Sequence, residues 1–382
     1  MRAYYADEPR FLGETDSQTI QNTIDRAHED GVGRIVIPRF NPRTNKPIWI
    51  IGKTILLPSD MTVVLDSCHL RLEDDVRENI FRNKNAWTPE GNTIGGEQHD
   101  IRIIGIGNAV LDGGKPNGLC EQMHRDDPLK NPHMQVNLLV FLHNVRHFEV
   151  SGFRCMESRW WATCFMFCRW GIIRDLDMRM YGTIENQDGV DIRIGCEYIT
   201  VENITGITGD DTVALTALPR DSYFEGMLHV EGKSIDIHDI TVRNIISSTH
   251  GCGIVRLLCE HGAKEYNIKI SDITDTGETI GGAAVLPVPG VEDKAVFVGI
   301  RPEGFIPDEA GGLLCEVSGV DVMGRDVSIV SKHKEMLTPS VRSIVDADYT
   351  LSEGQSEVRY ALKPHKVFLF DKTTEERIYF GV

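Results

Sequence analysis

Short apolar runs, each closed by a turn residue, recur along the first 280 residues of the chain. Each copy has an apolar residue, any residue, then Gly, Asp or Asn, then another apolar residue. An apolar run of this length, flanked by turn residues, is typical of a β-strand that ends in a turn. The copies occupy residues 103–106, 150–153, 173–176, 201–204, 242–245 and 270–273.

The spacing of these copies predicts a solenoid. Successive copies begin 47, 23, 28, 41 and 28 residues apart, and we interpret 47 as two coils and 41 as one coil with an insertion. Repeats that consist only of strands, with a period of about 20 to 30 residues, are typical of a parallel β-helix. Its stacked coils bury the inward side chains in one continuous core. An antiparallel sandwich with coincidental spacing is the alternative.

The segment before the repeats predicts a helix that covers the open end of this solenoid. Ile20, Ile24 and Ala27 would share one face of the helix, and Asp16 or Ser17 is the candidate N-cap. The first coil of a solenoid otherwise exposes apolar side chains and unpaired backbone groups. The sequence therefore predicts an all-β protein whose main part is a right-handed parallel β-helix with an N-terminal capping helix.

Composition narrows the classes of function. Of 382 residues, 41% are hydrophobic and 25% are charged, which excludes a disordered chain. The 57 acidic and 40 basic side chains give a formal charge of −17. Such a surface repels phosphate backbones, so we expect no nucleic-acid partner. No apolar run reaches the length of a membrane-spanning helix, so we expect no membrane span.

The cysteines and the N-terminus indicate which cofactors and which cellular compartment to expect. Nine cysteines without a Cys-x-x-Cys pair favour neither a disulfide framework nor a zinc site, so we expect no metal and no cofactor. The first residues lack the apolar segment of a signal peptide, and with free cysteines this favours a cytoplasmic protein. The length leaves room for two domains. The oligomeric state stays open, with a homo-oligomer among the options.

Three aspartates and one histidine form the sharpest chemical pattern. Asp188 lies in an Asn-Gln-Asp-Gly-Val-Asp segment, Asp210 and Asp211 follow a glycine, and His250 precedes one. Asp188 and Asp210 are 22 residues apart, about one coil, so we expect them to be stacked neighbours roughly 5 Å apart. Crowded carboxylates separate their pKa values, which provides the acid and the base that glycoside hydrolysis needs. The alternative is that these aspartates only cap turns.

The segments that carry these residues resemble glycoside hydrolase family 28, the polygalacturonases. Residues 14–72 look like the opening of pectate-lyase-superfamily β-helices. Residues 99–278 contain counterparts of the family's Gly-x-Gly, Asp-Gly, Asn-Thr-Asp, Gly-Asp-Asp and Gly-His-Gly segments. The resemblance implies a β-helix over residues 1–278 that hydrolyses a pectin-like or related oligosaccharide with inversion and without a metal. The alternative is a non-catalytic carbohydrate-binding or assembly module with an incomplete site.

The resemblance also implies a role for each of these residues. Asp210 would be the general acid on the leaving oxygen. Asp188 and Asp211 would bind and activate water, and His250 would tune the acid or hold the substrate. Thr249 stands where the family has a glycine before the histidine, a change that could displace His250.

Asn186, Trp161 and Arg256 are the candidate substrate-binding residues. Trp161 could form a platform on which a sugar stacks, although aromatic residues in a β-helix often stack internally instead. The family holds the uronate carboxylate with an Arg-x-Lys pair beyond the histidine, where this chain has Thr-Ile-Gly-Gly at 279–282. Arg256 is a basic residue closer to the histidine. Either the substrate is not a uronate, or the late coils are missing.

The last hundred residues resemble a different family. Residues 298–305, with the segment Gly-Ile-Arg-Pro-Glu, together with residues 319–326 and 362–371, resemble the C-terminal regulatory domain of sugar-importer ATPases. This resemblance implies a small OB-like β-barrel over residues 282–382. We therefore expect two domains, joined by the segment rich in glycine and proline at 281–290.

Overall fold

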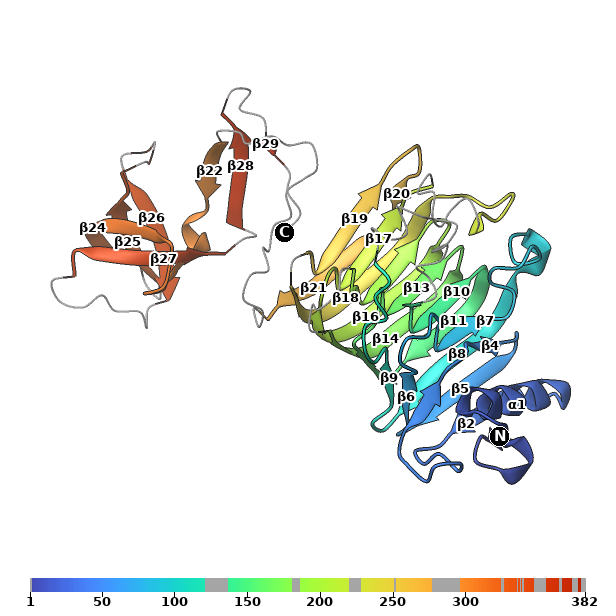
Figure 1. The fold of residues 1–382 in the computed structure, drawn as a ribbon. Coiled ribbons are helices and arrows are strands. Elements are labelled where there is room, and N and C mark those ends of the chain that lie inside the picture. The colour runs from blue at the N-terminus through green and yellow to red at the C-terminus, as the bar shows by residue number, and fades with distance from the viewer. Residues whose placement is uncertain are drawn as a thin grey trace. The chain divides into compact units, whose positions relative to one another are not determined.

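The chain forms two compact units, Met1–Ala284 and Val285–Val382 (Figure 1). The predicted junction at 278–282 lies outside the described residues. Among the described residues, no helix is long and apolar enough to cross a membrane. The computed structural model describes residues 2–120, 137–180, 186–219, 228–250, 252–276, 296–323, 326–334, 336, 338, 340–346, 355–363, 366–372 and 377–378.

The first unit is a right-handed parallel β-helix with one helix at its N-terminal end, as the sequence predicts. Its strands form a 14-stranded and a 7-stranded sheet. In spatial order the smaller sheet contains β19 (Val255–Cys259), β17 (Val213–Ala217), β15 (Val190–Arg193), β13 (Thr163–Met166), β10 (Val140–His143), β7 (Phe81–Asn83) and β4 (Ile55–Leu57). Every strand pair in this sheet is parallel.

The larger sheet covers the other sides of the coils. One row of strands consists of β1 (Tyr4–Tyr5), β2 (Arg34–Ile37), β5 (Met61–Asp66), β8 (Gln98–Ile106), β11 (Val145–Ser151), β14 (Arg169–Arg179), β16 (Glu197–Thr208), β18 (Ile237–Thr249), β20 (Glu265–Tyr266) and β21 (Lys269–Asp275). The long strand β14 also pairs with a second row, β12 (Arg154–Met156), β9 (Val110–Asp112), β6 (His69–Leu72) and β3 (Trp49–Ile51). Figure 1 shows these strands stacked along the first unit.

The repeated pattern found in the sequence lies in register through the stacked coils. Its first residues pair in the order Ile103, Val150, Ile173, Val201, Val242 and Ile270. The interpretation of the 47-residue spacing as two coils is wrong, because Ile103 pairs directly with Val150. The extra residues belong to a polar segment between β9 and β10 that has no alternating apolar run, so one coil carries a long insertion.

In five of the six copies the turn residue takes a left-handed backbone conformation, which explains its identity. The φ angles of Gly152, Asp175, Asn203, Asn244 and Asp272 lie between 52° and 79°. Glycine, asparagine and aspartate are the residues that visit this region at low cost. The side chains also form a ladder, since the Asn203 amide donates to Asp175 Oδ1 at 2.8 Å and the Asn244 amide donates to Asn203 Oδ1 at 2.7 Å.

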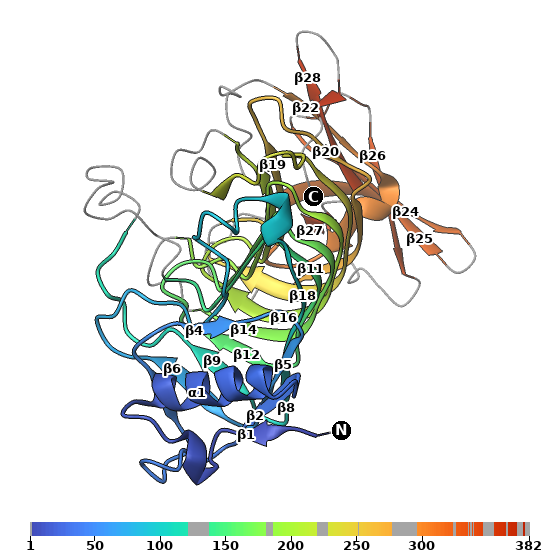
Figure 2. The ribbon, with the colours of Figure 1, turned by 90° about the vertical axis from the view of Figure 1, so that its right-hand side faces the viewer.

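Helix α1 (Asp16–Glu29) covers the N-terminal end, with Ile20, Ile24 and Ala27 fully buried. Figure 2 shows α1 beside β2, and α1 also packs against β3 and β4. The expected N-cap at Asp16 or Ser17 is wrong, because Thr15 Oγ1 accepts the Gln18 N–H at 3.1 Å.

Side chains of α1 bond to the backbone at the open edge of the first coil. Asp16 Oδ2 accepts the N–H of Ile50 in β3 at 2.8 Å, and Ser17 Oγ accepts the N–H of Gly52 at 3.1 Å. The Gln21 amide accepts from the N–H of Leu56 in β4 and donates to its carbonyl. The helix therefore supplies the hydrogen bonds that a neighbouring coil would otherwise supply.

The opposite end of the β-helix has no comparable cover among the described residues. Val242 and Ile245 in β18 are fully buried, whereas their partners Ile270 and Ile273 in β21 are exposed. Leu257 in β19 is also exposed. The last described coil therefore shows to solvent the apolar side chains that earlier coils bury against the next one.

The second unit is built from antiparallel strands. Its five-stranded sheet has the order β23 (Phe305–Pro307), β27 (Glu357–Leu362), β24 (Leu313–Met323), β25 (Asp326–Lys332) and β26 (Val341–Asp346). A three-stranded sheet contains β22 (Val296–Ile300), β28 (Val367–Asp371) and β29 (Arg377–Ile378). No strand pair among the described residues joins β23 to β26, so closure into an OB-like barrel, and kinship with the ATPase regulatory domain, stay predictions.

Gly152 provides a test of the coil packing. A Cβ atom at this position would lie 2.4 Å from the carbonyl oxygen of Gly105 in the neighbouring coil, and its φ is +79°. Gly118 has a similar φ of +77° but no heavy atom within 4 Å of such a Cβ. We expect Gly152→Ala to reduce the free energy of unfolding by about 1–3 kcal/mol more than Gly118→Ala, measured by urea denaturation. Equal losses for the two variants would contradict the close approach of the coils.

Candidate active site

The strand β15 carries charged side chains on the outer face of the smaller sheet. Val190 and Ile192 are buried in the core of the β-helix, so the alternate residues Asp191 and Arg193 point to the opposite face. Both are nevertheless buried, with 1% and 3% of their surfaces exposed. Two charged residues buried on the outer face of one coil make this part of the sheet a candidate site.

The same outer position continues into the next two coils. Asp191 pairs with Ala214 in β17, and Ala214 pairs with Arg256 in β19. Because parallel strands in register align their side chains across the sheet, these three residues form one column on the outer face. Arg256 and Asp191 are therefore two coils apart with a small residue between them.

The turns that precede β15 and β17 bring three predicted aspartates together. The N–H of Gly189 donates to the carbonyl of Asp211 at 2.9 Å, which stacks the two turns in adjacent coils. The negative charges of Asp210 and Asp211 both act on Asp188 and raise its pKa. Asp191 adds a fourth carboxyl to this group. The one-coil spacing read from the sequence thus places Asp188, Asp210 and Asp211 side by side.

Asp211 is fully buried, and both of its carboxylate oxygens have donors. The N–H of Gly253 donates to Oδ1 at 2.9 Å, and Arg256 Nη1 lies 3.2 Å from Oδ2. Burial raises the pKa of Asp211 to about 6, while the Gly253 N–H and the Arg256 guanidinium act in the opposite direction. Asp211 can therefore change its protonation state in the mildly acidic range.

Asp188 and Asp191 are buried, and they have carboxylate oxygens that lack such donors. Within the part of the chain that the structure describes, Oδ1 of Asp188 and both carboxylate oxygens of Asp191 have no hydrogen-bond partner. Burial is the main cause that raises the pKa of each carboxyl well above its usual range. For Asp191 the positive charge of Arg193 opposes this effect. Both carboxyls therefore favour the neutral, protonated form.

Asp210 is the least buried of the four aspartates. Its Oδ1 accepts the N–H of Asp211 at 3.0 Å, and its backbone carbonyl accepts the hydroxyls of Thr208 and Thr249 at 2.7 and 2.6 Å. The carboxylate also accepts a hydrogen bond from the thiol of Cys252. Two of these contacts hold the backbone of Asp210 and two hold its carboxyl, which remains partly accessible from solvent.

His250 does not join the aspartates among the described residues. Its side chain is exposed, and its backbone N–H donates a hydrogen bond to the carbonyl of Thr208 at 3.1 Å. Thr249 turns inward instead and bonds to Asp210. Cys252, which the sequence reasoning missed, contacts Asp210. No pattern in the sequence around His250 indicates that Cys252 would contact Asp210.

The candidate substrate-binding residues already have partners or structural roles. Trp161 is 7% exposed, and the Arg193 guanidinium lies 4.6 Å from the centre of its ring. Asn186 occupies a turn with a φ of 55°. Arg256 is ion-paired with Asp211. Trp161 is therefore a packed internal side chain and not an open platform on which a sugar stacks.

One group of possible metal ligands lies in this site. Ligand atoms of Asp210, Asp211 and Cys252 lie within 4.8 Å of one another. Asp211 already accepts from Gly253 and Arg256, and burial raises the pKa of the Cys252 thiol, which keeps it protonated. A positive guanidinium and a protonated thiol make this a poor set of ligands for a cation.

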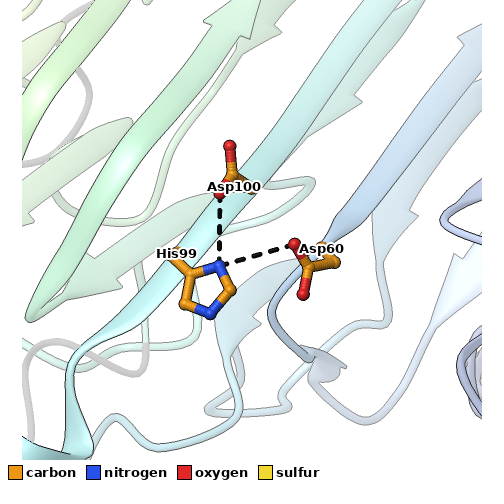
Figure 3. Close-up of side chains that lie close together, drawn as sticks. All are labelled: Asp60, His99 and Asp100. Carbon is orange, nitrogen blue, oxygen red and sulfur yellow. Dashed lines mark hydrogen bonds and ion pairs between the residues drawn. The ribbon is translucent and has the colours of Figure 1, made fainter.

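A second group lies on the larger sheet. His99 Nδ1 is 3.4 Å from Asp60 Oδ1 and 3.2 Å from Asp100 Oδ2, so both carboxylates lie on the Nδ1 side of the ring (Figure 3). Asp60 and Asp100 both have left-handed backbone conformations, with φ of 59° and 54°. Asp60 lies in the turn before β5, and Asp100 lies within β8. The His99 side chain therefore links β8 to the turn before β5.

Comparisons with known proteins found similar solved structures but no matching sequence. No protein-family model and no curated sequence matches the chain. Among solved structures, a polygalacturonase from Erwinia carotovora is 15% identical, with 71% of this chain and 80% of that chain covered and a TM-score of 0.43. An endo-xylogalacturonan hydrolase from Aspergillus tubingensis is 13% identical, with 71% and 72% covered and a TM-score of 0.42.

A tailspike protein of an E. coli bacteriophage, in complex with a hexasaccharide, is a third similar structure. It is 11% identical, with 70% of this chain and 50% of that chain covered and a TM-score of 0.45. These neighbours are glycosyl hydrolases and carbohydrate-binding tailspikes built on a β-helix. At such identities and TM-scores the similarity identifies neither a family nor a substrate.

Asp188 provides a test of the burial described above. An aspartate whose pKa is higher in the folded chain than in the unfolded chain stabilises the fold less as pH rises above the unfolded value near 4. We expect Asp188→Asn to raise the free energy of unfolding at pH 7 by about 1 kcal/mol, with the gain vanishing below pH 4. Urea denaturation at both pH values measures this.

The exposed residue Asp272 supplies the matched control, and Asp272→Asn should change stability little at either pH. A clear loss of stability at pH 7 in Asp188→Asn, with no loss in Asp272→Asn, would mean that the folded chain needs a charged Asp188.

Proposed function

We propose that the first unit is a glycoside hydrolase that cleaves a pectin-like or related oligosaccharide with inversion. One observation carries this proposal: Asp188, Asp210 and Asp211 meet from adjacent coils and differ in burial and hydrogen bonding. Glycosidic bond cleavage needs one carboxyl that gives a proton and another that takes one. Different environments for neighbouring carboxyls are the usual means of separating these roles.

Asp210 and Asp211 would divide the acid and base roles. Asp210 is the most accessible of the carboxyls, so it would reach the leaving oxygen as general acid. Asp211 has a cation and a backbone donor, so it would be the carboxylate that takes a proton from water. Asp188 favours its neutral form, so we revise its expected role as a base: it would donate a hydrogen bond to substrate or water.

The stereochemical outcome is the sharpest point of this proposal. One oxygen of Asp210 and one of Asp211 lie within 4.8 Å of each other. Inverting glycosidases separate their acid and base by roughly 6.5–9.5 Å, and retaining ones by roughly 5–5.5 Å. The short separation of Asp210 and Asp211 does not leave the gap for water that inversion needs, so the anomeric configuration of the first product is a strict test of inversion.

A non-catalytic carbohydrate-binding or assembly module is the second candidate. The observation that favours it is the burial of Asp188, Asp191 and Asp211, which are 4%, 1% and 0% exposed. The exposed position of His250 favours it as well. Such a module would bind oligosaccharide without producing new reducing ends.

The experiment combines an activity assay with one conservative variant. Wild-type protein incubated with polygalacturonate and mixed plant oligosaccharides should produce new reducing ends, and proton NMR should show the inverted anomer first. Asp210→Asn keeps the shape but removes the proton donor, so the rate should fall about 100-fold or more. Asp272→Asn is the control with unchanged rate.

Two results would contradict parts of this account. Full activity in a folded Asp210→Asn protein would remove Asp210 from the mechanism. Oligosaccharide binding without any cleavage by the wild-type protein would favour the binding module.

A further inference from the structure

We infer that Arg256 is a positioning residue, whose guanidinium holds Asp211 in place as the site's carboxylate instead of binding a carboxylate of the substrate. The inference rests on the proposed function for its catalytic meaning, but its structural part stands on contacts within the chain. It differs from the expectation that Arg256 binds substrate.

The first observation is that one short segment fixes both oxygens of Asp211. The Gly253 N–H bonds to Oδ1 at 2.9 Å, and Arg256 Nη1 lies 3.2 Å from Oδ2. Both donors come from the coil that follows Asp211. The Asp211 side chain is 0% exposed, whereas that of Arg256 is 37% exposed. Removal of the Arg256 guanidinium would therefore leave Oδ2 of the buried Asp211 without this donor.

The second observation is the small residue beside Arg256. Ala214 is the ladder neighbour of Arg256 on β17 and is 2% exposed. Its side chain ends at Cβ, which leaves the outer face of β17 open to the long arginine side chain. Arg256 can therefore lie along the sheet toward Asp211, which precedes β17. A leucine at position 214 would occupy the space next to the guanidinium.

The third observation is the charge around the pair. Four carboxyls face this part of the sheet, from Asp188, Asp191, Asp210 and Asp211, together with the protonated thiol of Cys252. Arg193 lies beside Asp191, and Arg256 lies beside Asp211. The positive charge of Arg256 lowers the pKa of Asp188, Asp191 and Asp211 alike. The direct ion pair with Asp211 makes that carboxyl the one most dependent on Arg256.

The experiment follows the titration of Asp211 directly, so it needs no enzymatic activity. Aspartate carboxyl signals are recorded by carbon-13 NMR between pH 3 and 9, and Asp211→Asn identifies the signal of Asp211. In Arg256→Gln the titration midpoint of Asp211 should rise by about one pH unit or more. In Arg256→Lys, which keeps the charge, the rise should be smaller.

Arg243 supplies the matched control on the same β-helix. It is an exposed arginine that pairs with Glu202 at 2.6 Å, away from the aspartates. Arg243→Gln should leave the midpoint of Asp211 unchanged. An unchanged midpoint in Arg256→Gln would overturn the inference, with Arg256→Lys and circular dichroism showing whether the chain still folds.

Kinetics separate this role from substrate binding. If Arg256 positions Asp211, Arg256→Gln lowers kcat on a uronate substrate and on a neutral oligosaccharide by the same factor and moves the pH optimum upward. A rise in KM for the uronate substrate alone would overturn the inference. If the wild-type protein cleaves no sugar, the proposed function fails while the titration still decides the role of Arg256.

Discussion

The candidate site depends on the register in which parallel coils pair. Because Val190 pairs with Val213, and Val213 pairs with Val255, the turns that precede these strands are stacked on one another. That stacking places Asp188, Asp211 and Gly253 in neighbouring coils, although 65 residues of sequence separate the first from the last. A shift of one residue in either pairing would move alternate side chains to the core. Helix α1 maintains the same order from the N-terminal end, since it supplies the hydrogen bonds that the first coil lacks.

Burial of like charges gives this stacked arrangement its chemistry. Several carboxyls in one dry region cannot all ionise, so each takes the protonation state that its own donors allow. Asp211 has a guanidinium and an amide, whereas Asp191 has no hydrogen-bond donor among the described residues. These differences in hydrogen bonding depend on residues 252–256 of the following coil, which supply the donors, as much as on the aspartates themselves. Burial of these carboxyls lowers the free energy of unfolding. Such a loss is common at functional sites and unusual in a purely structural turn.

Much of the fold follows from local sequence, and less of the site does. The turn pattern predicts the register, because only a few residue types tolerate the left-handed backbone seen at Asn203 and Asn244. The apolar face of α1 is also evident from spacing, but its N-cap is not, since Asp16 is used by a strand far along the chain. The partner of Arg256 depends on pairing across an insertion of unpredictable length. The outward turn of His250 depends on where one long strand ends, which no short pattern reports.

A crystal structure of the Asp210→Asn protein with a bound oligosaccharide tests the central claim most directly. The account predicts a sugar on the outer face of the smaller sheet, with a glycosidic oxygen about 3 Å from the side chain of residue 210. It also predicts that Arg256 remains paired with Asp211 in that complex. A sugar bound on another sheet or in the second unit, with the four aspartates unchanged and uncontacted, would contradict the claim that these carboxyls form an active site.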